Sequence, residues 1–228
     1  MNKEYGYVDS AFMHDGHRGR NDNRSISATQ FNKEPYQIRL EKENGTIEER
    51  PEDLVQRVVG TAVHEYIEKY GKGKYTVKEM YMEKEFDIDI DNIYTITGTA
   101  DIVEYNQETN KWVVKDIKTM GAFSLGKFEK GERDAQIRQL SIYRWMLRDK
   151  LPMEDYGEII AIGLGDRVKS RLSYTQIELL SDDEVERMML DFIEKIDTST
   201  ECKDTWSGRL CANYCNVICE ENKRCSTF

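Results

Sequence analysis

The feature that most constrains the fold is a series of apolar side chains that recur every three or four residues from Leu54 to Tyr70. This spacing places them along one face of an α-helix. Pro51 and the two acidic residues after it are typical of a helix start, and Gly71 lies where the series ends. The sequence therefore predicts an amphipathic helix over about residues 51–70, whose apolar face must pack against another element.

Strand-like segments follow this helix. They are rich in β-branched and aromatic residues or alternate between apolar and polar residues, and they lie at 77–90, 94–105, 111–119, 158–164 and 168–179. Between the third and fourth strands we expect a glycine-containing loop at 120–132 and a helix at about 133–149, and a last helix is expected from Asp182 to about Ile196. Helices before, between and after strands indicate an α/β fold, with a central sheet flanked by helices.

The length of 228 residues fits one domain. Within it we expect an irregular arm at 1–50 with a short element near 27–40, a core at 51–197 and a cysteine-rich tail at 198–228. No apolar run reaches the length needed to span a bilayer, and the polar start does not have the layout of a signal peptide. We therefore expect an intracellular, cytoplasmic protein, encoded either by a cell or by a phage that acts in its host.

Two acidic residues and a lysine fall within the predicted strands. Asp101 interrupts a run of Thr, Ile and Val, and Asp116 and Lys118 follow a second apolar run. Residues two apart in a strand share a face, so Asp116 and Lys118 point to one side while Ile117 points to the other. Pairing of the two strands would bring Asp101 close to Asp116. Such a pair of carboxylates is stabilised by a divalent cation, and a neighbouring lysine can orient a water or stabilise charge on a phosphate.

Other polar residues occur at matching places in the predicted helices. His64 lies beside the apolar stripe of the first helix, and its imidazole can bind a Mn²⁺-like ion. Gln139 and Tyr143 are four residues apart and so share a face of the second helix. A helix histidine is more often structural and an Asp-x-Lys is more often a solvated ion pair, so the order of these residues along the chain carries more weight than any one of them.

That order is His in a helix, Gly-x-x-Asp-Ile-Val in a strand, Asp-x-Lys in the next strand and Gln-x-x-x-Tyr in a helix. It resembles the PD-(D/E)xK nucleases, and most of all their RecB-type exonuclease branch, which includes the CRISPR-associated exonucleases and phage relatives. The resemblance runs from about Gly60 to Tyr143. It implies a restriction-endonuclease-like core with a central mixed β-sheet flanked by helices.

The resemblance also implies roles for the residues. His64, Asp101, Asp116 and the Ile117 carbonyl would bind Mg²⁺ or Mn²⁺. Lys118 would be the catalytic lysine, supported by Gln139 and Tyr143. We therefore expect a metal-dependent DNA exonuclease that acts on single strands or duplex ends in recombination, repair, or phage or CRISPR DNA processing. A helicase or another recombination or replication protein is the partner expected for such an enzyme.

The net charge of −10 by itself argues against DNA binding, which needs Lys and Arg for phosphate contacts. The charge is unevenly spread, however. Residues 115–150 hold nine Lys or Arg against five acids, a local excess of four positive charges. Aromatic residues in the same segment can stack on bases, and the candidates are Phe123, Phe128 and Trp145, of which the last fits the core equally well.

All five cysteines lie in the last 27 residues, at Cys202, Cys211, Cys215, Cys219 and Cys225. In an intracellular protein such a group more often binds metal than forms disulfides. A [4Fe–4S] cluster, a Zn²⁺ ion and free thiols all fit the spacing. In several RecB-like nucleases one of four cluster cysteines lies near the N-terminus. Here no cysteine precedes Cys202, so any cluster would take all its ligands from the tail.

Two other interpretations of the whole chain are open. One is a DNA-binding protein on the same fold that has no catalytic activity, although the intact Asp101, Asp116 and Lys118 argue against it. The other is a protein-interaction module built around a zinc-bound tail, in which changes at Asp116 would have no effect. Within the nuclease interpretation an endonuclease is also possible, because the motif does not encode a preference for ends.

Overall fold

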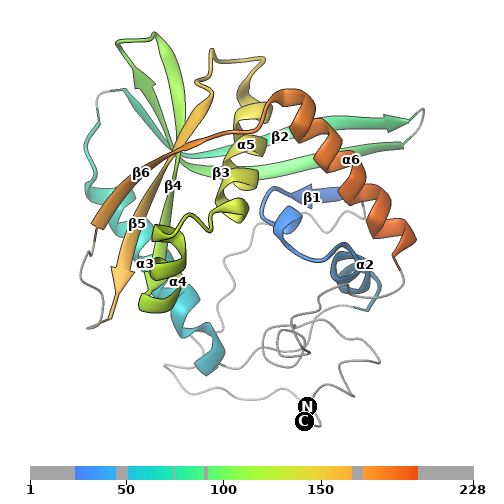
Figure 1. Ribbon diagram of the computed structural model, residues 1–228, viewed down its shortest axis with the longest axis horizontal. Coiled ribbons are helices and arrows are strands. Elements are labelled where there is room, and N and C mark those ends of the chain that lie inside the picture. The colour runs from blue at the N-terminus through green and yellow to red at the C-terminus, as the bar shows by residue number, and fades with distance from the viewer. Residues whose placement is uncertain (1–23, 45–50, 74, 90–91, 166–171, 200–228) are drawn as a thin grey trace. The chain divides into compact units, whose positions relative to one another are not determined.

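A computed structural model describes residues 24–44, 51–73, 75–89, 92–165 and 172–199 (Figure 1). The chain divides into two compact units. One comprises Arg24–Asn32 and Gly60–Leu190 and contains the β-sheet, and the other includes Lys33–Val59 and the chain from Asp191 onward. The cysteine tail lies outside the described residues, so the predictions for its five cysteines stay predictions. None of the helices in the described part is long and apolar enough to cross a membrane.

A short strand and a 3-10 helix come first in the described part of the chain, and ten further helices and strands follow. They are β1 (Ser25–Ser27), η1 (Gln30–Asn32), α2 (Pro35–Asn44), α3 (Pro51–Tyr70), β2 (Thr76–Asp89), β3 (Asn92–Asn106), β4 (Lys111–Gly121), α4 (Ala122–Glu129), α5 (Asp134–Leu147), β5 (Tyr156–Leu164), β6 (Leu172–Glu178) and α6 (Asp182–Thr198). The helix predicted over 51–70 is confirmed, and so is the α/β class with a mixed sheet flanked by helices.

The sheet is mixed because α4 and α5 connect two parallel strands. β4 pairs in parallel with β5, while β2 with β3, β3 with β4 and β5 with β6 are antiparallel. The short β1 pairs in parallel with β3. A parallel pair needs a long crossover, and the two helices between β4 and β5 supply it.

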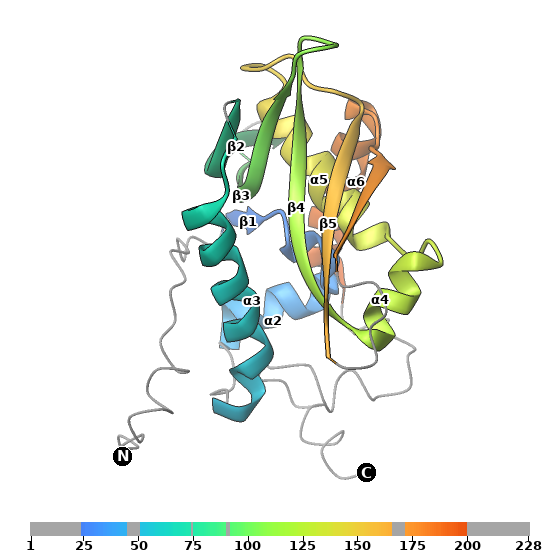
Figure 2. The ribbon, with the colours of Figure 1, turned by 90° about the vertical axis from the view of Figure 1, so that its left-hand side faces the viewer.

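β3 has different partners along its length on one of its edges. Its residues Thr95–Thr97 pair with both β1 and β2, and Ile102–Glu104 pair with both β2 and β4. A strand has two edges, so β1 and β4 must share the edge that β2 does not occupy. The pairing of β3 with β4 stops at Ile102 and Lys115, beyond which the two strands separate (Figure 2). This separation opens the sheet at the level of Asp101 and Asp116.

α5 packs closely on one face of the sheet, and α3 approaches the other (Figure 2). A Cβ added to Gly157 of β5 would lie 2.9 Å from Leu140 Cδ1 of α5, so the helix and the strand meet at van der Waals distance. On the opposite face, a Cβ on Gly60 of α3 would lie 3.3 Å from Thr119 Oγ1 of β4. The core of this unit is made by the apolar side chains between α5 and the sheet, which include Val103, Val114, Leu140, Ile142 and Ile159.

The loop expected at 120–132 is wrong over most of its length, because Met120 and Gly121 belong to β4 and Ala122–Glu129 forms α4. Its signal in the sequence is weak because Gly126 interrupts an eight-residue helix that has no side-chain cap. Leu125 and Phe128 are three residues apart and both buried, and this tertiary burial stabilises a helix that local preference does not. In the segment expected to be an irregular arm, Ser25–Ser27 joins the sheet and Pro35–Asn44 forms a ten-residue helix.

Candidate active site

The site is built where the ladder between β3 and β4 ends. The backbone N–H of Ile117 would have continued that ladder, but it donates to Asp101 Oδ2 at 2.7 Å instead. An unpaired buried N–H is costly, so the carboxylate of Asp101 takes the place of the missing strand partner. It thereby closes the end of the ladder and lies in the gap between the strands.

Asp101 reaches this gap because β3 changes its phase at that residue. Tyr94, Ile96 and Ala100 are buried at even positions, whereas beyond Asp101 the buried residue is Val103. On the partner strand β2, Glu79 has a left-handed backbone with φ of 44°, between the pairs Lys78–Ile102 and Met80–Ala100. The register of β2 and β3 is the same on both sides of this point, and the irregular backbone of Glu79 lies opposite Asp101, where the alternation of buried residues on β3 changes.

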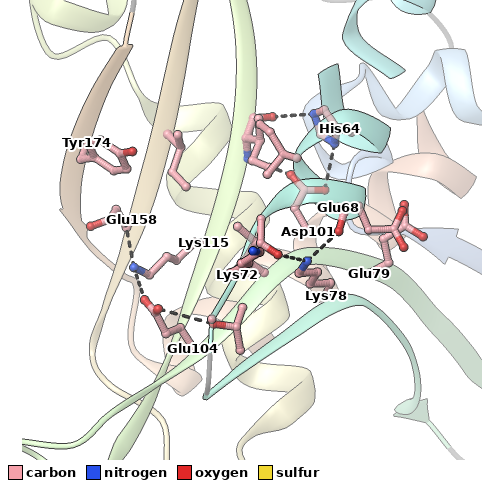
Figure 3. A pocket seen from close by; sticks show the side chains of 17 residues that line it. His64, Glu68, Lys72, Lys78, Glu79, Asp101, Glu104, Lys115, Glu158 and Tyr174 are labelled. Atoms are coloured by element: carbon pink, nitrogen blue, oxygen red, sulfur yellow. Dashed lines mark hydrogen bonds and ion pairs between the residues drawn. The ribbon is translucent and has the colours of Figure 1, made fainter. Parts of the chain in front are cut away.

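His64 comes to the same gap from α3. Its Nε2 donates to the Ile117 carbonyl oxygen at 3.0 Å, and its Nδ1 lies 3.4 Å from Asp101 Oδ1 (Figure 3). The hydrogen bond to Asp101 raises the pKa of His64, and the charges of Asp101 and Asp116 act in the same direction, while burial opposes them. Gly60, one turn earlier, permits the close approach of the helix that brings the imidazole to β4.

Asp116 is 2% exposed and lies on the face of β4 that α5 covers. Its Oδ1 accepts from Gln139 Nε2 at 3.1 Å and lies 3.0 Å from Lys118 Nζ, whereas its Oδ2 is buried with no hydrogen-bond partner among the described residues. Burial raises the pKa of Asp116 to about 6, and the charge of Asp101 adds to this effect, while Lys118 opposes it. An ionised carboxylate is therefore held in a place that disfavours it unless a cation is near.

Gln139 connects the other members of the site. Its Oε1 accepts from Lys118 Nζ at 3.2 Å, and its Nε2 donates to Asp116 Oδ1 and, at 2.9 Å, to the Tyr143 hydroxyl oxygen. One amide thus fixes the lysine, the buried carboxylate and the phenol relative to one another. Burial raises the pKa of Tyr143, so its hydroxyl stays protonated.

The nitrogen and oxygen atoms that meet in this gap are of the kinds that bind divalent cations. An imidazole, two carboxylates and the Ile117 carbonyl converge on the gap, and the buried Oδ2 of Asp116 is an acceptor for which the described part of the chain supplies no donor. In the structure these groups form hydrogen bonds and close contacts with one another. In the described part of the chain no three His, Cys, Asp or Glu side chains already form a compact ligand group. A cation bound by His64 Nε2 would replace the hydrogen bond that this nitrogen makes to the Ile117 carbonyl oxygen.

The structure brings together all the residues expected to act here: His64, Asp101, Asp116, Ile117, Lys118, Gln139 and Tyr143. Two of the aromatic residues considered for stacking on bases are buried, with Phe128 at 3% and Trp145 at 2% exposure. Trp145 packs edge-on against Phe86, and its indole N–H donates to Glu186. The stacking prediction is therefore wrong for these two, and the core position that the sequence also allowed for Trp145 is confirmed, whereas Phe123 is 74% exposed.

One contributor to the site was missed in the sequence. Gly98 lies under Tyr143, and a Cβ there would lie only 2.6 Å from Tyr143 Cε1. A glycine inside a strand often marks such a close approach, so a signal was present. Its partner could not be named, however, because Tyr143 of α5 lies more than forty residues further along the chain.

Comparison with known proteins gives a family. A family model described as the PD-(D/E)XK nuclease superfamily matches residues 71–225, which is more than half of the chain. No curated protein matches the sequence. The crystal structure of SSO0001 superposes with a TM-score of 0.60 at 21% identity, covering 94% of this chain and 92% of that chain, and at this identity it shows a shared fold.

Two further solved structures are more distant. One is an alkaline exonuclease (LHK-Exo) from Laribacter hongkongensis, with a TM-score of 0.47 at 13% identity, covering 83% of this chain and 91% of that chain. The other is LHK-Exo in complex with dAMP, with a TM-score of 0.45 at 14% identity, covering 78% and 89%. At these TM-scores the likeness is loose.

Proposed function

Because the chain belongs to the PD-(D/E)XK nuclease superfamily, we propose that it hydrolyses phosphodiester bonds of DNA with Mg²⁺ or Mn²⁺, and that it acts as an exonuclease on single strands or duplex ends. The observation that carries this proposal is the convergence of His64, Asp101, Asp116 and Lys118 where β3 and β4 separate. Oδ2 of Asp116, a buried carboxylate oxygen with no hydrogen-bond partner in the part of the chain that the structure describes, lies in the same gap.

In this proposal His64, Asp101, Asp116 and the Ile117 carbonyl hold the cation. When bound, it would supply charge neutralisation at the phosphate and a water of lowered pKa. Asp101 has a second role, because its bond to the Ile117 N–H keeps β4 in place beside the gap. It therefore fixes the position of the carbonyl that follows that N–H in the same residue.

We assign to Lys118 the direct contact with the attacking water and the phosphate. Its Nζ is held by Gln139 Oε1 and by Asp116 Oδ1, and its side chain is 32% exposed. The ammonium is therefore fixed in direction and still accessible to a substrate. From there it can orient the attacking water and offset the negative charge that develops on the phosphate oxygens.

The proposal is tested by cleavage of end-labelled single- and double-stranded DNA in Mg²⁺, in Mn²⁺ and in EDTA. We expect cleavage with either metal, none in EDTA, and a loss of at least about a hundredfold in Lys118→Ala, as is typical when a group that stabilises transition-state charge is removed. Lys111→Ala is the matched control, since Lys111 lies on the same strand and pairs with Glu154 at 3.8 Å. The ladder from each labelled end gives the direction of digestion.

No cleavage with any metal, by a folded protein that binds DNA, would favour a binding protein on the same fold. Internal cleavage of a circular substrate would instead make the protein an endonuclease. Cleavage that Lys118→Ala retains in full would remove Lys118 from the mechanism.

For the cysteine tail we propose a [4Fe–4S] cluster with a structural role, with zinc as the alternative. It rests on the five thiols within the last 27 residues and on the ability of such groups to bind either metal. Protein purified without oxygen should contain iron and inorganic sulfide in equal amounts and absorb visible light. If the protein contains zinc and no sulfide, the tail holds a zinc site and not a cluster. If it contains neither iron nor zinc, the cysteines are free thiols. Cys211→Ser is expected to lower the metal content and Ser207→Ala to leave it unchanged.

A further inference from the structure

A cavity of about 220 Å³ opens directly beside the candidate active site. It lies between the C-terminal part of α3, the start of β2 and strands β3 to β6 (Figure 3). His64 and Asp101 belong to its wall, so it is continuous with the gap between β3 and β4. Lys115 and Ile117 also line it, and these residues lie on the face of β4 opposite to Asp116 and Lys118. The cavity is thus on the face of the sheet that α5 does not cover.

The floor of the cavity is apolar. It is formed by isoleucines from one helix and three neighbouring strands, namely Ile67, Ile102, Ile117 and Ile160. Tyr174 of β6 lies at the rim with 63% of its surface exposed (Figure 3). An apolar floor beside an exposed aromatic ring suits a flat, weakly hydrated group such as a nucleobase, which gains from stacking and from leaving water.

Polar groups on the wall are mainly acidic. Lys115 forms ion pairs with Glu158 at 3.0 Å and with Glu104, in a row across β3, β4 and β5 (Figure 3). Over the whole lining, five carboxylates face three lysines, namely Glu68, Glu79, Asp101, Glu104 and Glu158 against Lys72, Lys78 and Lys115.

This charge distribution selects among the parts of a nucleotide. An excess of negative charge repels a phosphate. Carboxylates can nevertheless accept hydrogen bonds from the exocyclic amino groups of bases, and a lysine can donate to their ring nitrogens and carbonyls. The wall therefore favours the base over the phosphate. The cavity volume also favours a base over a larger ligand, because it is below the roughly 300–1,000 Å³ of pockets that bury whole drug-sized ligands.

We propose that this cavity receives the base of the nucleotide whose phosphate is cleaved, with Tyr174 against its face and the Glu104–Lys115–Glu158 row at its edge. The inference rests on the proposed nuclease function, since it is the phosphate at His64 and Asp101 that would bring the base to the cavity. It makes the cavity a binding site for one nucleotide and Tyr174 a residue that determines affinity for it.

Two variants test the cavity, each with a matched control. Ile160→Phe fills the floor, and Ile162→Phe is its control because Ile162 lies two residues along on the same face of β5, is also half-buried, and is outside the lining. Tyr174→Ala removes the ring at the rim, with Tyr81→Ala as control because Tyr81 is similarly exposed on a strand at 57% and is also outside the lining. Thermal unfolding of all four variants checks that each is folded.

The substrates are labelled oligonucleotides that carry either a normal nucleotide or an abasic sugar at one end, with both ends tested. The wild-type protein should cleave the abasic end about tenfold less efficiently in kcat/KM, which corresponds to about 1.4 kcal/mol and falls within the usual range for stacking of one base. Ile160→Phe and Tyr174→Ala should cleave normal ends about tenfold more slowly than wild type and lose the preference over abasic ends. Tyr174→Phe should retain the preference.

The outcomes separate this inference from the nuclease proposal. If wild type cleaves normal and abasic ends equally, or if the two cavity variants keep the preference, the cavity does not bind the base, although the nuclease proposal stands. If wild type cleaves neither substrate, the nuclease proposal fails. In that case, calorimetric titration with the four deoxynucleoside monophosphates and with deoxyribose 5-phosphate still decides the inference. Weaker binding of the baseless sugar that disappears in Ile160→Phe supports a base site, and equal binding of all five compounds overturns it.

Discussion

Asp116 is a carboxylate in surroundings that disfavour its negative charge. It is buried on the α5 face of β4, it is close enough to Asp101 to interact with its charge, and one of its oxygens has no donor among the residues that the structure describes. Lys118 and Gln139 compensate in part, since both contact the other oxygen. Burial of a charge with incomplete compensation is expected to lower stability, and such residues are typical of functional sites.

Replacement of Asp116 by Asn should therefore separate stability from metal binding. The amide keeps the shape and removes the buried charge, so we expect Asp116→Asn in EDTA to unfold at the same temperature as wild type or higher. Wild type should be stabilised by added Mn²⁺ according to the degree of saturation, about 2.7 kcal/mol at a hundred times the dissociation constant. The variant should lose most of this response.

Differential scanning fluorimetry with a titration of Mn²⁺ measures both effects. Asp155→Asn is a suitable control, since Asp155 is exposed in the turn before β5. A large drop in the unfolding temperature of Asp116→Asn in EDTA would mean that the carboxylate is a net stabilising group. Full retention of the Mn²⁺ response would show that Asp116 is not a ligand.

At the scale of elements, the contact between β3 and α5 positions the polar residues of the site. Gly98 leaves the space that the Tyr143 ring occupies, and Tyr143 in turn accepts the hydrogen bond from Gln139, which holds Lys118. The Asp101 side chain is three residues beyond Gly98 on the same strand. β3 thus contributes Asp101 and the space above Gly98. α5 contributes the Tyr143 ring, which fills this space and accepts a hydrogen bond from Gln139.

Gly98→Ala should accordingly affect both stability and activity. The added Cβ would lie 2.6 Å from the Tyr143 ring, so either the ring or the helix must shift, at a cost of about 1–3 kcal/mol for overpacking. In the background of Tyr143→Ala the same substitution should cost much less, because the obstructing ring is gone. A double-mutant cycle in urea measures this coupling.

The control for this prediction is Gly126→Ala. Gly126 lies within α4, and a Cβ there meets nothing within 4 Å, so the substitution should be neutral or slightly stabilising. If Gly98→Ala costs the same with and without the Tyr143 ring, then the effect of Gly98 arises from the strand and not from its contact with α5.

At the scale of the whole molecule, charge is arranged differently from its distribution along the sequence. The segment 115–150 has an excess of Lys and Arg, but at least five of these nine cations pair with carboxylates, namely Lys115, Lys118, Lys127, Arg144 and Arg148. Several of the partners lie outside the segment, including Glu104, Glu158, Asp182 and Glu186. The segment therefore does not present a continuous cationic track for a DNA backbone.

We therefore expect the affinity for DNA to change only weakly with salt concentration. For single strands the slope of log K against log salt is about −0.7 for each phosphate contacted, so a slope no steeper than about −3 indicates about four contacts or fewer. Fluorescence anisotropy with the Lys118→Ala protein and a labelled single strand in Ca²⁺ gives this slope. A much steeper dependence would reveal a cationic surface that the ion pairs of the sheet and helices do not predict.

Much of the fold and the candidate site follows from local patterns. Apolar spacing gave the helix over 51–70 and the strands that carry Asp101 and Asp116, because a side-chain period of 3.6 or 2 is a property of the backbone itself. The same alternation placed Asp116 and Lys118 on one face and Ile117 on the other, as observed. The order of motifs was enough to indicate the superfamily, which the family comparison confirms.

Other features were decided only by tertiary packing. α4 forms because Leu125 and Phe128 find a buried environment, although its local sequence favours a loop. The bond from the Ile117 N–H to Asp101, the bridging role of Gln139 and the space under Gly98 each depend on elements far apart in the chain. The cavity beside His64 likewise needs one helix and five strands at once. Periodicity determines which face a side chain takes, but its partner is determined by which elements the folded chain brings against that face.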